Sequence, residues 1–270
     1  MKILGFIGLG NMGSAIIGGI LGSGRAEPED IIGSDHSQQG RERAEELYKI
    51  ATTGDNREVA RKADILFFAV KPQFLDDVLT EIRDELPEGQ LIVSIVAGRS
   101  VSYYQKMLGE KVRLVRLMPN TPALVGAGMT AACCSPGVTK EEMEEVGDLC
   151  RTFSLFEVVP ETLFDAVTGV SGSSPAYVFM FIEAMADAAV LGGMPRAQAY
   201  KFAAQAVLGS AKMMLDTGKH PGELKDMVCS PAGTTIEAVR VLEERGFRSA
   251  VIEGTVACIE KSAEMNASKN

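Results

Sequence analysis

Residues 3–13 read ILGFIGLGNMG, and this stretch decides the fold of the first half of the chain. An apolar run ends in a G-x-G-x-x-G pattern, and a helix-forming segment follows it over residues 11–24. Between a strand and a helix, this pattern is the dinucleotide fingerprint. Gly8 permits the tight turn, Gly10 lets a pyrophosphate approach the backbone, and Gly13 lets helix and strand pack closely. A glycine-rich turn without a ligand is the alternative, and the strand–turn–helix context argues against it.

The rest of the first half alternates short apolar runs with amphipathic segments. This alternation is typical of right-handed βαβ crossovers, and continuous apolar runs are typical of parallel strands buried on both faces. We therefore predict an α/β Rossmann-type parallel sheet domain over residues 1–160. The expected strands cover residues 3–10, 31–35, 63–72, 90–98 and 111–120, with helices over 38–50 and 76–86 and edge strands over 129–135 and 156–159.

From residue 161 onward the pattern becomes helical. Residues 175–191 and 195–218 each open with proline, which suits the first helical position. The first of these helices begins apolar on all faces, so it must be buried from every side. A domain of this size has little interior, which makes a subunit interface the economical explanation. We predict an all-α C-terminal dimerisation domain over residues 161–270, with a frayed tail from Ser262.

Composition excludes several classes of function. The chain has 270 residues, a formal net charge of −9 and an estimated pI of 4.9, which argues against nucleic-acid or anionic-membrane partners. Five cysteines without a CxxC pair and two histidines suggest neither a disulfide framework nor a metal site. The uncharged stretch over residues 3–24 is broken by glycines and does not resemble a membrane span. A reducing cytoplasm is the expected location.

The end of the second predicted strand bears on cofactor choice. An acid about 20 residues after the fingerprint binds the ribose hydroxyls of NAD, whereas NADP favours a nearby arginine or small hydrogen-bond donors. Asp35 stands at that position, while Ser34, Arg41 and Arg43 are candidates for a 2′-phosphate. The arginines have a second interpretation as solvated helix charges, so the sequence leaves NADPH and NADH open.

Three further segments fall at the carboxyl ends of predicted strands, where ligands bind in open α/β sheets. These are AVKP (69–72), VAG (96–98) and MPNTP (118–122). Lys71 is a candidate cation facing a ribose or a substrate, although an exposed loop lysine fits its position equally well.

Residues 229–243, CSPAGTTIEAVRVLE, place small and hydroxyl-bearing residues directly before a helix. Thr234 and Glu237 have capping-box spacing, so we predict Thr234 as the N-cap and a helix that starts at Thr235. The free N–H groups and dipole of such a helix start suit a carboxylate. An ordinary capped helix that binds nothing is the alternative.

Together these motifs resemble the pyrroline-5-carboxylate reductase family, which performs the last step of proline biosynthesis. The similarity runs in order from about residue 3 to residue 262, and the C-terminal stretch is its most specific part. The segments that carry it are GFIGLGNMG, FFAVKPQ, RLMPNTPALVGAG, DAVTGVSGSSPAYVF and HPGELKDMVCSPAGTTIEAVRVLE.

The resemblance implies hydride transfer from NADPH, with NADH as the alternative donor, to the imine of 1-pyrroline-5-carboxylate, giving L-proline. The cofactor residues that it implies are Gly8, Gly10, Asn11, Met12 and Gly13 at the pyrophosphate, Ser34 and Asn56 at the adenosine end, and Val70, Lys71, Pro72 and Ala97 at the nicotinamide riboside. The implied substrate residues are Glu161, Ser171, Ser173, Ser230, Gly233, Thr234 and Thr235. Catalytic roles fall on Thr235, as a hydrogen-bond donor to the imine nitrogen, and on Ser230 and Lys71. The family also implies a homodimer through the C-terminal helices, assembled into a larger homo-oligomer, a decamer in similar proteins.

Two alternatives use the same first domain. A 3-hydroxy acid dehydrogenase places a catalytic lysine on the helix after a glycine-rich turn, and here no lysine occurs between Lys140 and Lys201. A non-catalytic NADP-binding sensor would have no need of the CSPAGTT loop or of residues 165–179. Both features argue for the reductase.

Overall fold

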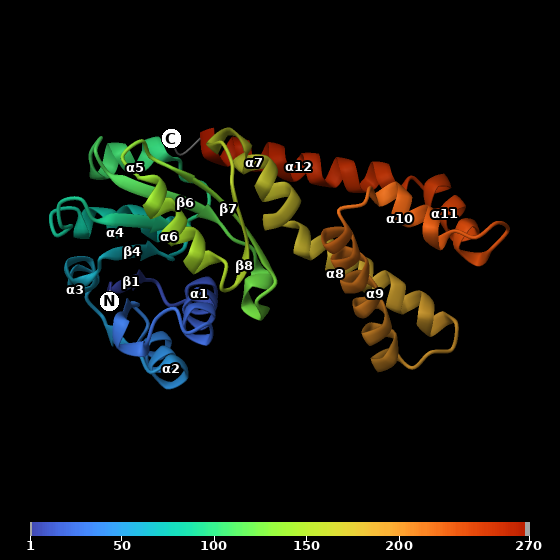
Figure 1. Ribbon diagram of the computed structural model, residues 1–270, viewed down its shortest axis with the longest axis horizontal. Helices are drawn as coiled ribbons and strands as arrows, with labels where there is room; N and C mark the ends of the chain where they lie inside the picture. Colours follow the sequence, from blue (N-terminus) through green and yellow to red (C-terminus); the bar gives the residue numbers. More distant parts are fainter. Residues whose placement is uncertain (1, 268–270) are drawn as a thin grey trace. The chain divides into compact units, whose positions relative to one another are not determined.

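A computed structural model of the chain describes residues 2–267 (Figure 1). The chain forms two compact units. The first contains the residues up to Gly172 together with those from Cys258 onward, and the second is Ser173–Ala257. The sequence boundary at residue 160 therefore lies inside the first unit, just after its last strand.

The first unit is built on an eight-stranded sheet with the order β3-β2-β1-β4-β5-β6-β7-β8. Neighbouring strands run parallel except for β6 and β7, which pair antiparallel. The strands are β1 (Leu4–Ile7), β2 (Ile31–Ser34), β3 (Ala51–Thr53), β4 (Ile65–Phe68), β5 (Leu91–Ser94), β6 (Arg113–Met118), β7 (Gly128–Cys134) and β8 (Ser154–Val158). This confirms the predicted Rossmann-type sheet, with two differences. Strand β3 was not predicted, and β7 is not an edge strand, because β8 pairs with its free side.

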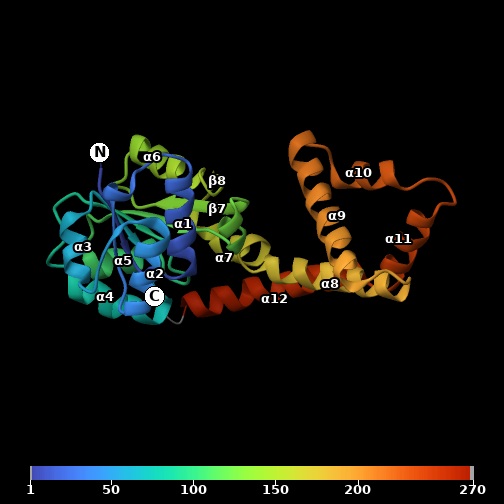
Figure 2. The same cartoon turned by 90° about the horizontal axis from the view of Figure 1, so that it is seen from below.

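Helices cover both faces of this sheet, as Figure 2 shows from a second side. They are α1 (Asn11–Gly22), α2 (Gln38–Tyr48), α3 (Asn56–Lys62), α4 (Leu75–Ile82), α5 (Val101–Leu108), α6 (Lys140–Cys150) and α7 (Phe164–Val167). Apolar side chains of α1, α2 and α6 form one core cluster against the sheet, and those of α3, α4 and α5 form another on the opposite face. Residues of β1, β2, β4, β5, β6 and β7 alternate between the two clusters, so these six strands are buried on both sides, as their apolar runs predicted.

Two glycines of the fingerprint are required by the fold itself. Gly8 has a φ of +105°, and a Cβ on it would lie 2.7 Å from the backbone of Ala69. A Cβ on Gly13 would lie 2.5 Å from the carbonyl oxygen of Gly8. Such distances admit no larger residue, so these positions bring β1, α1 and the end of β4 into close contact.

The second unit is helical. The helices within it or entering it are α8 (Ser174–Leu191), α9 (Arg196–Thr217), α10 (Pro221–Val228), α11 (Thr234–Glu244) and α12 (Phe247–Ala267), which runs on into the first unit. Two expected proline positions shift by one residue: Pro175 is the second residue of α8, and Pro195 is the N-cap of α9. Pro195 stays outside because its backbone is still extended, with ψ at 137°.

Large apolar side chains of α8 and α9 are exposed, which agrees with a helix that needs a partner surface. Phe179 and Met180 are 65% and 69% exposed. By length and composition alone, the continuous helical stretch Glu161–Leu191 could also cross a membrane. An 18-residue segment of it has a mean hydropathy of 1.4, and 6% of that segment is buried. Apolar surface of this kind marks an interaction face.

The predicted capping box on α11 is wrong. The helix begins at Thr234, one residue earlier than expected, with Gly233 as an N-cap that has no side-chain hydrogen bond. The Glu237 carboxylate pairs with the Arg240 guanidinium on the next turn instead, at 2.7 Å. That ion pair holds the carboxylate away from the backbone N–H that a capping box would satisfy.

The predicted frayed tail is also wrong over its described part. Helix α12 continues through Ser262 to Ala267. The side chains of Ser262 and Asn266 both donate hydrogen bonds to Asp165 on α7. A tertiary contact therefore orders a stretch whose composition looked unstructured.

Candidate active site

The glycine loop at the start of α1 forms a cradle that fits a pyrophosphate. In contrast to Gly8 and Gly13, a Cβ on Gly10 would meet no described atom within 4 Å. The fold therefore does not require glycine there, whereas a ligand lying against the backbone would. No described side chain caps α1, and its first turn holds no acid. The N–H groups at Asn11, Met12 and Gly13 thus form a helix start that suits an anion.

Asp35, at the end of β2, holds the glycine loop. Its Oδ2 accepts the N–H of Leu9 at 2.9 Å, and its Oδ1 accepts the N–H of Ser37 at 2.9 Å. The Arg41 guanidinium folds back over this turn and donates to the Asp35 carbonyl oxygen at 2.6 Å. Backbone donors thus occupy both carboxylate oxygens, and an arginine lies beside the carboxyl end of β2.

Ser34 and Asn56 form a pair behind this edge. Ser34 is 0% exposed and donates its hydroxyl hydrogen to Oδ1 of Asn56 at 2.8 Å. The Asn56 amide in turn donates to Glu81 at 2.8 Å. Because Ser34 is buried, it does not contact a cofactor phosphate directly in this arrangement. Its hydrogen bond instead fixes the side chain of Asn56, which is half-buried at the start of α3.

The segments expected at the nicotinamide end are linked by an arginine that the sequence analysis missed. Lys71 and Ala97 are exposed at the carboxyl ends of β4 and β5, and Lys71 forms no ion pair with any described residue. Between them, buried Arg99 pairs with Asp76 at 2.9 Å and donates to the Pro72 carbonyl oxygen at 3.5 Å. Its guanidinium also lies 4.6 Å from the Tyr103 ring centroid. Arg99 therefore joins the two loops.

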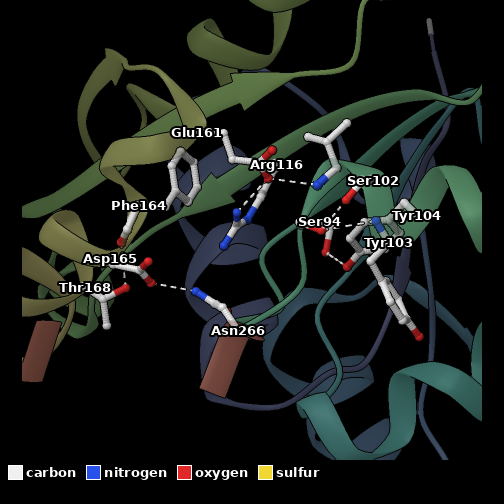
Figure 3. A network of polar contacts seen from close by, with 12 residues as sticks. Ser94, Ser102, Tyr103, Tyr104, Arg116, Glu161, Phe164, Asp165, Thr168 and Asn266 are labelled. Carbon is white, nitrogen blue, oxygen red and sulfur yellow. Dashed lines mark hydrogen bonds and ion pairs between the residues drawn. The ribbon is translucent and has the colours of Figure 1, made fainter. Parts of the chain in front are cut away.

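Glu161 takes part in a partly buried ion pair, drawn in Figure 3. Its Oε1 lies 2.7 Å from Nη1 of Arg116, a side chain on β6 that is only 7% exposed. The same oxygen accepts the N–H of Val101, the first residue of α5, at 2.8 Å. The Arg116 guanidinium lies over the Phe164 ring at 4.3 Å. Glu161 thus connects β6, α5 and the segment leading to α7.

The glycine–serine turn forms a π-helical segment over residues 168–172, a rare geometry that often occurs at functional sites. Ser171 donates its hydroxyl hydrogen to the Val167 carbonyl oxygen at 3.0 Å, and its own backbone carbonyl oxygen accepts a hydrogen bond from the Asn120 amide at 3.0 Å. Asn120 belongs to the MPNTP segment, so two of the predicted motifs are in contact. Ser173 is the first residue of the second unit.

The remaining predicted substrate residues form one loop in the second unit, ahead of α11. Ala232 has a φ of 57°, a left-handed conformation that a residue with a Cβ seldom adopts. Gly233 donates its N–H to the Ser230 carbonyl oxygen at 3.1 Å, and a Cβ on it would lie 2.3 Å from the Ser230 hydroxyl. The hydroxyl-bearing Thr234 and Thr235 follow in the first turn of a helix without a side-chain cap. A strained turn before an uncapped helix start fits an anion site.

The two units therefore divide the predicted site. The first unit gathers the cofactor residues along the carboxyl edge of its sheet, together with Glu161 and Ser171, while Ser173 and the 230–235 loop belong to the second. At the same edge, His36 and Phe74 follow β2 and β4, and their rings lie 5.9 Å apart with the His36 side chain 86% exposed. The sequence analysis did not select either residue.

Within residues 2–267, no group of three or more His, Cys, Asp or Glu side chains is placed to hold a metal ion. All five cysteines are free thiols. Burial raises the pKa of Cys133 and of Cys150 to about 12, so both stay protonated and unreactive near neutral pH.

Fold and loop geometry define the class first: a Rossmann-type oxidoreductase with a helical second unit. Comparison with known sequences then gives the family. Residues 161–265 match the family model for pyrroline-5-carboxylate reductase dimerisation, and residues 3–98 match the model for NADP oxidoreductase, coenzyme F420-dependent. The chain is 55% identical over 267 residues to pyrroline-5-carboxylate reductase of Escherichia coli strain K12, covering 99% of both chains. It therefore belongs to the pyrroline-5-carboxylate reductase family.

Solved structures agree. The pyrroline-5-carboxylate reductase of Coxiella burnetii superposes with a TM-score of 0.92 at 34% identity, covering 98% of each chain. A pyrroline carboxylate reductase of Plasmodium falciparum, solved with NADP bound, gives a TM-score of 0.89 at 32% identity, also over 98% of each chain. The predicted fold class is confirmed, and the dimerisation model supports a homo-oligomer.

Proposed function

We propose that this chain reduces 1-pyrroline-5-carboxylate to L-proline with NADPH as the hydride donor. The observation that carries the proposal is that one chain of the reductase family has both a Gly10 cradle open for a pyrophosphate and the CSPAGTT loop. When bound, the nicotinamide supplies the hydride to the imine carbon, while a proton reaches the imine nitrogen. The protein's contribution is to bind the cofactor and substrate, to orient them toward each other and to polarise the imine.

The substrate carboxylate is assigned to the start of α11. Gly233 is its N-cap, and Thr234 and Thr235 are its first residues, so N–H groups without side-chain partners face the loop. Ser230 adds a hydroxyl beside Gly233. We assign Thr235 the hydrogen bond to the imine nitrogen: its hydroxyl is a poor acid by itself, so it orients the imine and relays a proton from water.

Two residues, Asp35 and Arg41, support the proposal of NADPH over NADH. An aspartate that selects NAD offers both carboxylate oxygens to the ribose hydroxyls. Here each of these oxygens already accepts a backbone N–H, from Leu9 or Ser37, which leaves less of its acceptor capacity for ribose hydroxyls. The Arg41 guanidinium, held on the Asp35 carbonyl oxygen, supplies the positive charge that a 2′-phosphate needs.

For assembly, we propose a homodimer through the exposed apolar faces of α8, α9 and α12, joined into a larger homo-oligomer such as a decamer. Phe179 and Met180 on α8 and Phe202 on α9 are examples of large side chains that a partner subunit would cover. The same surface explains why Glu161–Leu191 has membrane-like hydropathy. We assign the enzyme to the cytoplasm, where its five free thiols would stay reduced.

The test follows NADPH and NADH oxidation in parallel with 1-pyrroline-5-carboxylate. We expect turnover with both cofactors and a higher kcat/KM for NADPH. Arg41→Ala should lower the kcat/KM for NADPH about tenfold and change the kcat/KM for NADH by less than about twofold. Arg43→Ala, on the same helix, tests the second candidate arginine for the 2′-phosphate. Thr235→Ala should lower kcat about 10²-fold, and Thr235→Ser, which keeps the hydroxyl, should restore most of it. A folded protein that binds NADPH without turnover would support the sensor instead.

A further inference from the structure

We propose that Asn266, held by Asp165, is a positioning residue that keeps the loop between β5 and α5 in its cofactor-binding conformation. The inference rests on the proposed cofactor site, because Ala97 in that loop is assigned to the nicotinamide riboside. It gives a role to the end of α12, whose sequence carries no motif. All the residues involved belong to the first unit.

Two side chains near the end of α12 anchor this helix to α7. Ser262 and Asn266 lie one helical turn apart, and each donates a hydrogen bond to Oδ1 of Asp165 at 2.6 Å. Hydrogen bonds to an ionised carboxylate are stronger than neutral ones. Figure 3 shows the Asn266 side chain pointing from the end of α12 toward Asp165. The amide group is therefore fixed in position.

The Asn266 side chain also lies close to the loop between β5 and α5. Gly98 has a φ of +72°, and a Cβ on it would lie 3.4 Å from Oδ1 of Asn266. The carboxamide oxygen thus lies beside Gly98, at van der Waals distance from where a side chain would begin, and next to exposed Ala97. Glycine has more accessible backbone conformations than any other residue, so holding Gly98 in this one conformation requires contacts from outside the loop.

The loop is held at two neighbouring residues. Arg99 joins it to Pro72 and Asp76, beside Lys71. Asn266 lies beside Gly98. Asp165 is fixed in turn, because its neighbour Phe164 is 2% exposed and packs under Arg116. The Asn266 carboxamide thus links α12 to the edge of the sheet where the nicotinamide is expected.

The experiment compares the full-length chain with Asn266→Ala, Asp165→Asn and Lys261→Ala. Lys261 is exposed on the same helix and pairs with Glu264 at 3.0 Å, so it is the matched control. Two quantities are measured: the affinity for NADPH by calorimetry, and hydrogen exchange of the amides of residues 96–101 without cofactor. Neither needs turnover, so a wild-type protein that fails to reduce the imine would remove the proposed function and leave this test valid.

We expect Asn266→Ala to weaken NADPH binding about fivefold to tenfold. Hydrogen exchange over residues 96–101 should become about tenfold faster, while exchange of the sheet amides stays unchanged. Asp165→Asn keeps one carbonyl acceptor, so its effects should be about twofold to threefold. Lys261→Ala should change neither. In steady state, the KM for NADPH should rise in Asn266→Ala while kcat stays within about twofold.

Unchanged exchange over residues 96–101 in a folded Asn266→Ala protein would overturn the inference, even if activity fell. If that variant does not fold, Asp165→Asn decides: faster exchange with weaker NADPH binding supports the role, and no change in either overturns it.

Discussion

The carboxylate of Asp35 accepts the backbone N–H of Leu9 at 2.9 Å, so the acid at the end of β2 is a structural part of the glycine loop. The same side chain accepts the N–H of Ser37, the N-cap residue of α2. A position that suggests NAD from spacing alone therefore supports the loop for either cofactor.

The first prediction concerns this carboxylate. Asp35→Ala should raise the KM for NADPH and for NADH by a similar factor, about tenfold, because two charge-assisted hydrogen bonds are lost beside the cradle. The NADPH-to-NADH ratio of kcat/KM should change less than about threefold. Steady-state kinetics with both cofactors measure this, and Asp35→Asn, which keeps one acceptor, should lie between. A selective loss of NADH would instead place the carboxylate on the ribose.

The second prediction concerns the ion pair of Arg116 and Glu161. Glu161→Ala leaves a buried guanidinium unpaired, so the free energy of unfolding should fall by about 2–3 kcal/mol, less than for a fully buried pair because the Glu161 side chain is 34% exposed. Glu161→Gln keeps the shape and one acceptor, and should cost about 1 kcal/mol. Denaturant titration at fixed protein concentration measures both values.

The same variants test the substrate role assigned to Glu161. If the carboxylate acts only through Arg116 and Val101, Glu161→Gln should keep kcat and the substrate KM within about twofold. A folded Glu161→Gln protein with a much higher substrate KM would show that the charge itself acts at the substrate.

The third prediction is a pH dependence at Tyr103. Burial and the hydrogen bond from its hydroxyl to Asp76 raise its pKa from 10.0 to about 12. Below pH 10 the phenol is neutral in both folded and unfolded chains, so its contribution to stability is complete. Between about pH 10 and 12 the unfolded chain loses this proton and the folded chain keeps it, which favours unfolding.

The comparison is with Tyr103→Phe. This variant should be less stable than wild type at pH 8, because the bond to Asp76 is lost, and the difference should shrink as the pH rises above about 10. Thermal unfolding across this range measures it, and the ionisation of Tyr104 and the lysines is common to both proteins. A difference that stays constant to pH 12 would contradict the shifted pKa.

Local sequence patterns predicted the parts of the fold that local physics determines. The apolar runs and the glycine fingerprint gave β1, α1, β2, β4, β5 and β6, because burial on both faces requires apolar residues and Gly8 and Gly13 meet backbone atoms. Strand β3 was missed because it has three residues and is half exposed. Long-range pairing decided the place of β7, since no local pattern shows that β8 will add to its free side.

The site divides in the same way. Motif spacing located the glycine loop and the CSPAGTT loop, but not the buried arginines that connect loops. Arg99 and Arg116 look like ordinary surface charges in the sequence, and only the fold brings Asp76 and Glu161 to them. Glu237 is the opposite case, since its capping-box spacing was misleading because Arg240 lies within reach on the same helix.

The last prediction concerns the strained turn ahead of α11. Ala232 adopts a φ of 57°, which costs about 1 kcal/mol for a residue with a Cβ and nothing for glycine. Ala232→Gly removes this strain but adds freedom to the unfolded chain, so a net gain of about 0.5 kcal/mol in unfolding free energy is expected. Lys49, at φ 58°, should respond to glycine in the same direction, whereas Ala127, an exposed loop alanine outside this region, should lose stability. Because glycine adopts the same turn, the KM of Ala232→Gly for 1-pyrroline-5-carboxylate should stay within about twofold. Melting temperatures at equal protein concentration decide the matter: if Ala232→Gly and Ala127→Gly lose stability alike, the turn carries no strain.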